Sequence, residues 1–141
     1  MENAQKKDGF VAVVKADGYG HGAKEAAEAA LRGGADMLAV ATTEEGAELR
    51  RYGFSCPVLV LGAVTAEEVR PGVEAGLTQT VCSPVMVALC EKAAAEAEKQ
   101  TEVHLKIDTG MGRIGIRTAE EKQRMLVELS RSPHVRLTGA Y

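Results

Sequence analysis

Short apolar runs recur along this chain at intervals of about 20 to 30 residues, and segments with helical periodicity separate them. Each run has the length of one strand, and most runs are apolar on both faces, which is typical of a parallel sheet that helices cover. The predicted strands are Phe10–Lys15, Met37–Ala41, Val58–Leu61, Thr78–Cys82, Val103–Ile107 and Val135–Gly139. The sequence therefore predicts an α/β fold in which a βα unit repeats about five times before a sixth strand.

Start and stop signals frame the predicted helices. Thr and Glu stand three residues apart, as in a capping box, at Thr42/Glu45, Thr65/Glu68 and Thr118/Glu121, and Ser83-Pro84 pairs an N-cap with a proline at the first helical position. The first helix has an apolar stripe of Ala23, Ala26, Ala27, Ala30 and Leu31, and Gly33-Gly34 stops it. Right-handed crossovers between the strands give either an open doubly wound sheet or an arc of a barrel, and this pattern leaves both open.

The length of the chain limits how much of a barrel it can form. It has 141 residues, whereas a complete eight-stranded β/α barrel takes roughly 250. No linker or change in composition divides it, so we treat residues 1–141 as part of one domain.

Composition excludes several classes of function. Seventeen basic and 20 acidic residues give a formal charge of −3, and the scattered basic residues predict neither nucleic-acid nor anionic-membrane binding. Cys56, Cys82 and Cys90 lack CxxC spacing, so we expect free thiols in preference to a disulfide or a metal site. With no signal peptide and no apolar run of membrane-spanning length, a cytoplasmic location is expected.

The first predicted strand ends in a lysine, and a glycine-rich segment follows it. Lys15 shares a strand face with Val11 and Val13, which places its amine at the carboxyl edge of the sheet, where α/β proteins have their sites. Removal from water disfavours a charged amine, and the neutral amine is the form that attacks an aldehyde. The three glycines within residues 18–22 allow backbone to approach a ligand, and Tyr19 can donate to a phosphate oxygen. A solvated lysine beside an ordinary turn explains the spacing equally well.

The second candidate segment runs from His104 to Gly115. Alternation places His104, Lys106 and Asp108 on one face of the predicted strand and apolar residues on the other. Enclosed polar side chains need hydrogen-bond partners, so this face is expected to line a site or a barrel interior. Arg113, in the loop beyond, offers a planar fork for a carboxylate or phenolate oxygen. The alternative is an exposed edge strand with a solvated polar face.

The same segment contains Gly110-x-Gly112-x-x-Gly115, which matches the dinucleotide-binding fingerprint as a bare pattern. That fingerprint requires a helix that opens within the glycines and an acidic residue at the end of the next strand. Here the capping box begins the helix at Thr118, and the strand near Val135 brings no acidic residue. The context therefore disfavours NAD or FAD.

Taken together, Ala12–Gly22 and Lys106–Gly115 closely resemble the two best-known signatures of bacterial alanine racemases. They occur in the same order and at about the same separation, and the intervening strands also fit, so the resemblance covers nearly the whole chain. It implies a partial (β/α)8 TIM-type barrel of about six parallel strands with intervening helices, truncated before barrel closure.

The resemblance implies a pyridoxal 5'-phosphate-dependent isomerase that interconverts L- and D-alanine. Lys15 would hold the cofactor as a Schiff base and act as the base on one face of the substrate. Tyr19 would contact the cofactor phosphate, and Arg113 would contact the cofactor's phenolic oxygen and the substrate carboxylate. Lys106 matches a family lysine that is often carbamylated, a change that would let it hold Arg113 in place. No metal is implied.

The resemblance also implies a homodimer with shared active sites, in which a tyrosine of the partner subunit is the second acid/base, and a role in making D-alanine for the cell wall. That tyrosine lies beyond the barrel in the family, so we expect residues 1–141 alone to be inactive. Serine remains an alternative substrate. Two other classes also remain: a non-catalytic pyridoxal-phosphate-binding barrel, expected to lack the Lys106/Arg113 pair, and a structural domain with an incidental lysine.

Overall fold

The computed structural model describes residues 9–63 and 65–141, where six strands alternate with helical segments. The strands are β1 (Val11–Val13), β2 (Met37–Val40), β3 (Val58–Ala63), β4 (Thr78–Val81), β5 (Thr101–Leu105) and β6 (Val135–Ala140). The helical segments are α1 (Lys15–Gly20), α2 (Ala23–Arg32), α3 (Thr43–Arg51), α4 (Ala66–Glu74), α5 (Pro84–Glu96) and α6 (Ala119–Ser130). Every predicted strand is present, but the bounds predicted for the fifth, Val103–Ile107, are wrong by two residues at each end.

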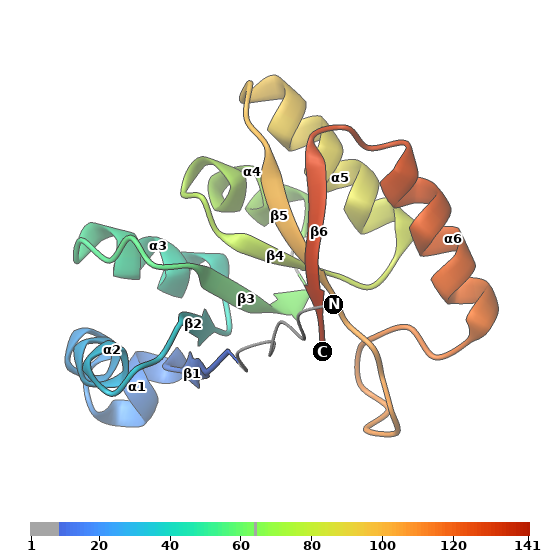
Figure 1. Ribbon diagram of the computed structural model, residues 1–141. Helices are drawn as coiled ribbons and strands as arrows, with labels where there is room; N and C mark the ends of the chain where they lie inside the picture. Colours follow the sequence, from blue (N-terminus) through green and yellow to red (C-terminus); the bar gives the residue numbers. More distant parts are fainter. Residues whose placement is uncertain (1–8, 64) are drawn as a thin grey trace, which may run out of the picture.

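The strands form one parallel sheet in the order β1-β2-β3-β4-β5-β6, so each strand pairs with the next one in the chain. Right-handed crossovers that always step in the same direction place every helix on the same face. Figure 1 shows this arrangement, with the helices along the outer side of a curved sheet. A doubly wound sheet would reverse its strand order, so the order observed selects the arc of a barrel.

The hydrophobic core lies between the sheet and the helices. Val58, Val60 and Val103 of the strands and Val87 and Met125 of the helices are fully buried in it. Among residues 9–63 and 65–141 no helix covers the other face, so the predicted cover by helices is found on one face only. There, in β1, Val11 and Val13 are 42% and 40% exposed.

The predicted helix starts are confirmed. Thr42 and Thr118 each accept from the amide three residues later, and Glu45 and Glu121 return the contact, so both capping boxes are complete. At α4, Glu68 accepts from the backbone amide of Thr65. Ser83 is the N-cap of α5, with a proline at the first position. These local signals set where the helices begin and hence how long each loop at the carboxyl edge of the sheet can be.

The three cysteines are free thiols, as the sequence predicts. Cys90 is buried in the core, where burial raises the pKa of its thiol to about 12. Over residues 9–63 and 65–141, no helix has the length and apolar character that crossing a bilayer requires.

Candidate functional site

Lys15 opens a turn of left-handed backbone at the carboxyl end of β1. The four residues that follow it, Ala16, Asp17, Gly18 and Tyr19, have φ between 51° and 60°. Left-handed helical backbone costs a residue with a side chain roughly 1–2 kcal/mol, so such turns persist only where surrounding contacts stabilise them. The predicted glycine-rich turn is therefore present in an unexpected form, because three of its four left-handed residues are not glycine.

Local contacts hold this turn against α2. The Gly18 amide donates to the Val14 carbonyl at 3.0 Å, and the Ala23 amide donates to Asp17 Oδ1 at 2.7 Å. A Cβ added at Gly18 would lie 2.7 Å from Cβ of Ala26, so the packing requires glycine at this position, which its positive φ also favours. One of the free amides at the start of α2 therefore already donates to the Asp17 carboxylate and is not available to a ligand.

Lys106 directly follows β5 and lies beside Tyr141. Lys106 Nζ lies 4.3 Å from the centroid of the Tyr141 ring, within the range of a cation–π interaction. Thr80 Oγ1 donates to the Val60 carbonyl at 2.6 Å and so accepts from the Tyr141 hydroxyl at 2.8 Å. Burial raises the pKa of Tyr141 above that of an ordinary tyrosine. The predicted alternation holds at His104 and Lys106, opposite buried Val103 and Leu105.

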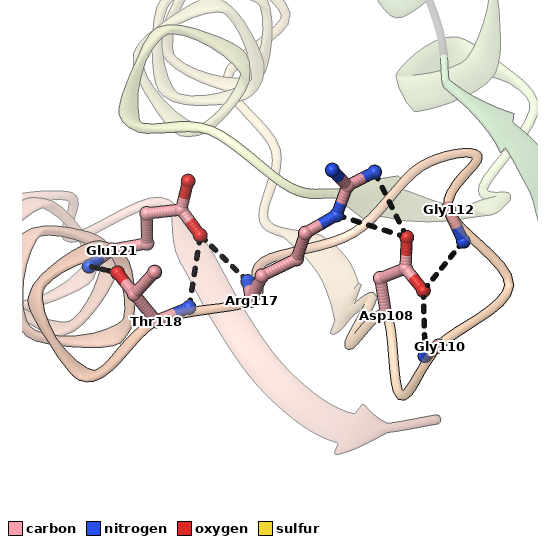
Figure 2. A network of polar contacts seen from close by, with 6 residues as sticks. All are labelled: Asp108, Gly110, Gly112, Arg117, Thr118 and Glu121. Carbon is pink, nitrogen blue, oxygen red and sulfur yellow. Dashed lines mark hydrogen bonds and ion pairs between the residues drawn. The ribbon is translucent and has the colours of Figure 1, made fainter.

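Asp108 organises the loop between β5 and α6. Its Oδ1 accepts from the amides of Gly110 and Gly112, each at 3.0 Å, and its Oδ2 accepts from Arg117 Nε at 3.1 Å and Nη2 at 3.0 Å. Figure 2 shows the carboxylate between the two backbone amides and the guanidinium. The Asp108 side chain is only 1% exposed, whereas that of Arg117 is 55% exposed. Asp108 therefore shapes the loop, and both of its oxygens are already engaged.

Both ends of this loop are tied to regular structure. The Asp108 amide donates to the Ile116 carbonyl at 2.9 Å, and the Ile116 amide donates to the Lys106 carbonyl at 2.9 Å. The Arg117 amide donates to Glu121 Oε2 at 2.6 Å, and Glu121 caps α6 (Figure 2). Between these ties Arg113 is exposed to solvent. A loop that is closed at its base and braced inside can present such a side chain with little loss of entropy on binding.

The Asp108 contacts predict an acid-dependent loss of stability. Hydrogen bonds from the Gly112 and Gly110 amides, followed by the Arg117 guanidinium, lower the pKa of Asp108 to about 2. Since an unfolded aspartate titrates near ~3.9, this stabilisation is complete above that pH and is lost as the pH falls towards 2. We expect Asp108→Asn to melt at a lower temperature than the parent chain at pH 7, and the gap to close on acidification. Thermal unfolding followed by circular dichroism measures the gap, and one that stays constant from pH 7 to pH 2 would contradict this assignment.

The structure brings some of the predicted site residues together. Lys106 and Arg113 line one cavity of about 120 Å³, together with Asp108 and Met111. Lys15 is half-buried and Tyr19 is 60% exposed, and both lie beyond β1, several strands away. All strands are parallel, so these residues share the carboxyl edge of the sheet, where β/α barrels have their sites.

A larger cavity of about 250 Å³ lies at the amino end of the strands. Its lining includes Arg50, whose guanidinium donates to four backbone carbonyls, those of Phe54, Cys56, Ala75 and Gly76. The donors of Arg50 are thus already used in hydrogen bonds that stabilise the fold. This cavity also lies at the amino end of the strands, whereas β/α barrels have their sites at the carboxyl end. We therefore place the functional site at the carboxyl edge despite the smaller cavity there.

Sequence reasoning missed the partners that hold the site residues. Tyr141 reaches both Lys106 and Thr80 only because β4, β5 and β6 pair. Arg117 carries one local signal, because it directly precedes the capping box of α6, but its contact with Asp108 depends on the path of the loop. Within the described residues, no cluster of side chains suits a metal ion.

The fold and the site define the first part of a β/α barrel that has a lysine at the carboxyl end of its first strand. A family model described as "Alanine racemase, N-terminal domain" matches residues 1–141. The chain therefore belongs to the alanine racemase family and corresponds to its N-terminal domain.

Individual relatives agree with this assignment. The alanine racemase of Symbiobacterium thermophilum is 41% identical over 141 residues, which are 100% of this chain and 37% of that protein. The solved alanine racemase of Clostridium difficile 630 superposes with a TM-score of 0.90 at 36% identity, over 96% of this chain and 36% of the other. A histidine racemase from Leuconostoc mesenteroides superposes with a TM-score of 0.85 at 25% identity, over 94% of this chain and 37% of the other. The chain thus spans little more than a third of the length of these relatives.

Proposed function

We propose that the protein carrying this domain is a pyridoxal 5'-phosphate-dependent racemase that interconverts L- and D-alanine. The observation that carries the proposal is the placement of Lys15. This chain belongs to the family, and its Lys15 stands at the carboxyl end of the first barrel strand, directly before a left-handed turn that specific contacts hold. A half-buried lysine at this place suits a carbonyl partner, because it is partly shielded from water and still partly accessible.

The chemistry of the donor groups fits the cofactor. Pyridoxal phosphate has an aldehyde, a phenolic oxygen and a dianionic phosphate, and the carboxyl edge offers one amine and two further cations, Lys106 and Arg113. The only carboxylate among the residues that line the Lys106 cavity is Asp108, which Arg117 pairs with. This cavity therefore attracts anions, and Tyr19, four residues after Lys15, adds an exposed side chain with a hydroxyl donor.

Each residue then has a distinct role. The bound cofactor supplies the electron sink that makes the Cα proton of an amino acid removable. Lys15 would hold the cofactor at its aldehyde, and its Nζ would take or return the Cα proton on one face of the substrate. Arg113 orients the substrate by pairing its planar fork with the carboxylate and the phenolic oxygen, and the braced loop fixes where that fork can reach. Tyr19 donates its hydroxyl to the phosphate.

Further roles are proposed from the family. Lys106 is the residue we propose to be carbamylated; its Nζ lies 4.3 Å from the centroid of the Tyr141 ring, and it lines the same cavity as Arg113. We also propose a cytoplasmic homodimer with shared active sites, a free amino acid as the substrate, and D-alanine for the cell wall as the product. Neither a nucleic acid nor a membrane is proposed as a partner.

The proposal is tested with a chain completed to family length. Residues 1–141 replace the matching segment of the Symbiobacterium relative, and the purified chimera is loaded with pyridoxal phosphate. We expect conversion of L-alanine to D-alanine, measured by chiral chromatography, at least tenfold faster than conversion of L-serine or L-histidine.

Other outcomes separate the alternatives. A folded chimera that binds the cofactor but racemises none of the three amino acids would support the non-catalytic barrel. Faster conversion of serine or histidine would support racemisation as the reaction but contradict alanine as the preferred substrate.

A further inference from the structure

The Glu45 carboxylate lies at the junction between Lys15 and the helix that follows β2. Its Oε1 accepts from the Ala16 amide at 2.8 Å, 29 residues away in the sequence. Its Oε2 accepts from the amides of Ala41 at 2.7 Å and Thr42 at 3.3 Å. One carboxylate thus joins the residue after Lys15 to the end of β2 and the start of α3.

The two oxygens of Glu45 have separable tasks. The capping box of α3 needs only Oε2, which accepts from Thr42, and the Thr42 hydroxyl, which accepts from the Glu45 amide. The bond from Ala16 to Oε1 adds nothing to that cap, because it joins a different strand–loop segment. A glutamine can still cap a helix, so the cap alone does not require a carboxylate at position 45.

The Ala16 amide is the first backbone donor after Lys15, and Ala16 is the first left-handed residue of the turn, with φ 51°. This conformation is unfavourable for alanine, so it persists only if other contacts, such as a hydrogen bond to the Ala16 amide, stabilise it. A charged acceptor forms a stronger bond with an amide than a neutral one does. Glu45 therefore restrains the direction in which the chain leaves β1, together with the bonds that Gly18 and Asp17 make within the turn.

We propose that Glu45 is a positioning residue for Lys15: by holding the Ala16 amide it orients the lysine amine for reaction with the cofactor aldehyde. The inference rests on the proposed function for its reaction step, while the hold on Ala16 can be tested without the cofactor. Glu45 does not itself touch the reacting atoms, so its effect passes through Lys15.

Glu45→Gln is the informative variant. The amide oxygen at the Oε2 position keeps the bonds to Ala41 and Thr42, which leaves the NH2 group facing the Ala16 amide, donor against donor. Two controls isolate this effect. Thr42→Ala breaks the capping box but leaves the Glu45 carboxylate in place, and Glu44→Gln removes the same charge from an exposed neighbour on the first turn of α3.

The first readout is amide hydrogen exchange of the 141-residue chain, measured by NMR without cofactor. We expect exchange at the Ala16 amide to be at least tenfold faster in Glu45→Gln than in the parent chain, and within twofold of the parent in Glu44→Gln. Equal exchange at Ala16 in the parent and in Glu45→Gln would overturn the inference, whatever the fate of the proposed function.

The second readout is the rate at which pyridoxal phosphate becomes trapped on Lys15 by borohydride. A purely structural role would lower the amplitude in proportion to the unfolded fraction and leave the rate for folded chains unchanged. A positioning role lowers the rate instead, and we expect a loss of at least tenfold in Glu45→Gln but less than twofold in Thr42→Ala. A parent chain that labels at Lys15 at the same rate as Glu45→Gln would overturn the positioning role and leave the proposed function intact. A parent chain that does not label at Lys15 would count against the proposed function. Hydrogen exchange would still show whether Glu45 holds the Ala16 amide.

Discussion

Replacing Lys15 by alanine is expected to abolish both the covalent pyridoxal phosphate adduct and racemisation. The amine at position 15 has two proposed tasks, binding the aldehyde and moving the Cα proton, and alanine can perform neither. Loss of a general base alone lowers rates by about 10²–10⁴-fold. In the chimera we therefore expect the rate with L-alanine to fall by about 10⁴-fold or more.

Lys24→Ala is the matched control for this experiment. Lys24 lies on the exposed side of α2, only nine positions further along the chain, so its loss removes the same charge from the same region. The control is expected to keep the adduct and the full rate. If Lys15→Ala retained more than one tenth of the parent activity, a different amine would have to serve as the base.

The largest expected effect on stability follows from Arg50, at the opposite end of the sheet. Its guanidinium donates to Ala75 and Gly76, which follow α4, and to Phe54 and Cys56, which precede β3, at 2.9–3.0 Å. Arg50→Ala leaves these four carbonyls without their charged donor. We expect the free energy of unfolding of the 141-residue chain to fall by about 3 kcal/mol, as measured by urea denaturation.

Two further variants serve as controls for the predicted fall in the free energy of unfolding. Arg51→Ala removes the same charge from the neighbouring exposed position and is expected to cost less than about 0.5 kcal/mol. Arg50→Lys keeps the charge but lacks the planar fork, so we expect it to lose about half as much stability as the alanine variant. An alanine variant as stable as the parent would show that water replaces the guanidinium at no cost.

The strands and helix starts were predictable because their determinants are local. A short apolar run between helical segments is enough to place a strand, and Thr118 and Glu121 lie three residues apart wherever the helix packs. Local sequence signals could not decide between a barrel arc and a doubly wound sheet. It depends on which strands pair, and the alternation of elements is the same in both folds.

The turn after Lys15 was beyond sequence reasoning for a physical reason. Ala16 and Tyr19 have no intrinsic preference for left-handed backbone, so their conformation is imposed from outside the turn. The groups that impose it include Glu45, which is remote in the sequence and becomes a neighbour only when β1 and β2 pair. Lys15 could be proposed as a site residue from the sequence, because a lysine that closes an apolar strand is unusual.

The loop that carries Arg113 was predicted in part. Its position after the fifth strand and the helix start at Thr118 are confirmed. Alternation placed Asp108 with His104 and Lys106 on the site face, but the strand ends at Leu105 and the carboxylate turns into the loop. A period of two is valid only while the strand continues, and nothing in the pattern marks where it ends.

The central claim is that Lys15 is the amine that binds the cofactor. The most direct test is to reduce the mixture of pyridoxal phosphate and the chimera with borohydride, digest it, and locate the pyridoxyl group by mass spectrometry. The account predicts one dominant labelled peptide that contains Lys15, with label elsewhere at least tenfold lower. Label spread evenly over exposed lysines such as Lys24, or concentrated at Lys106, would contradict it.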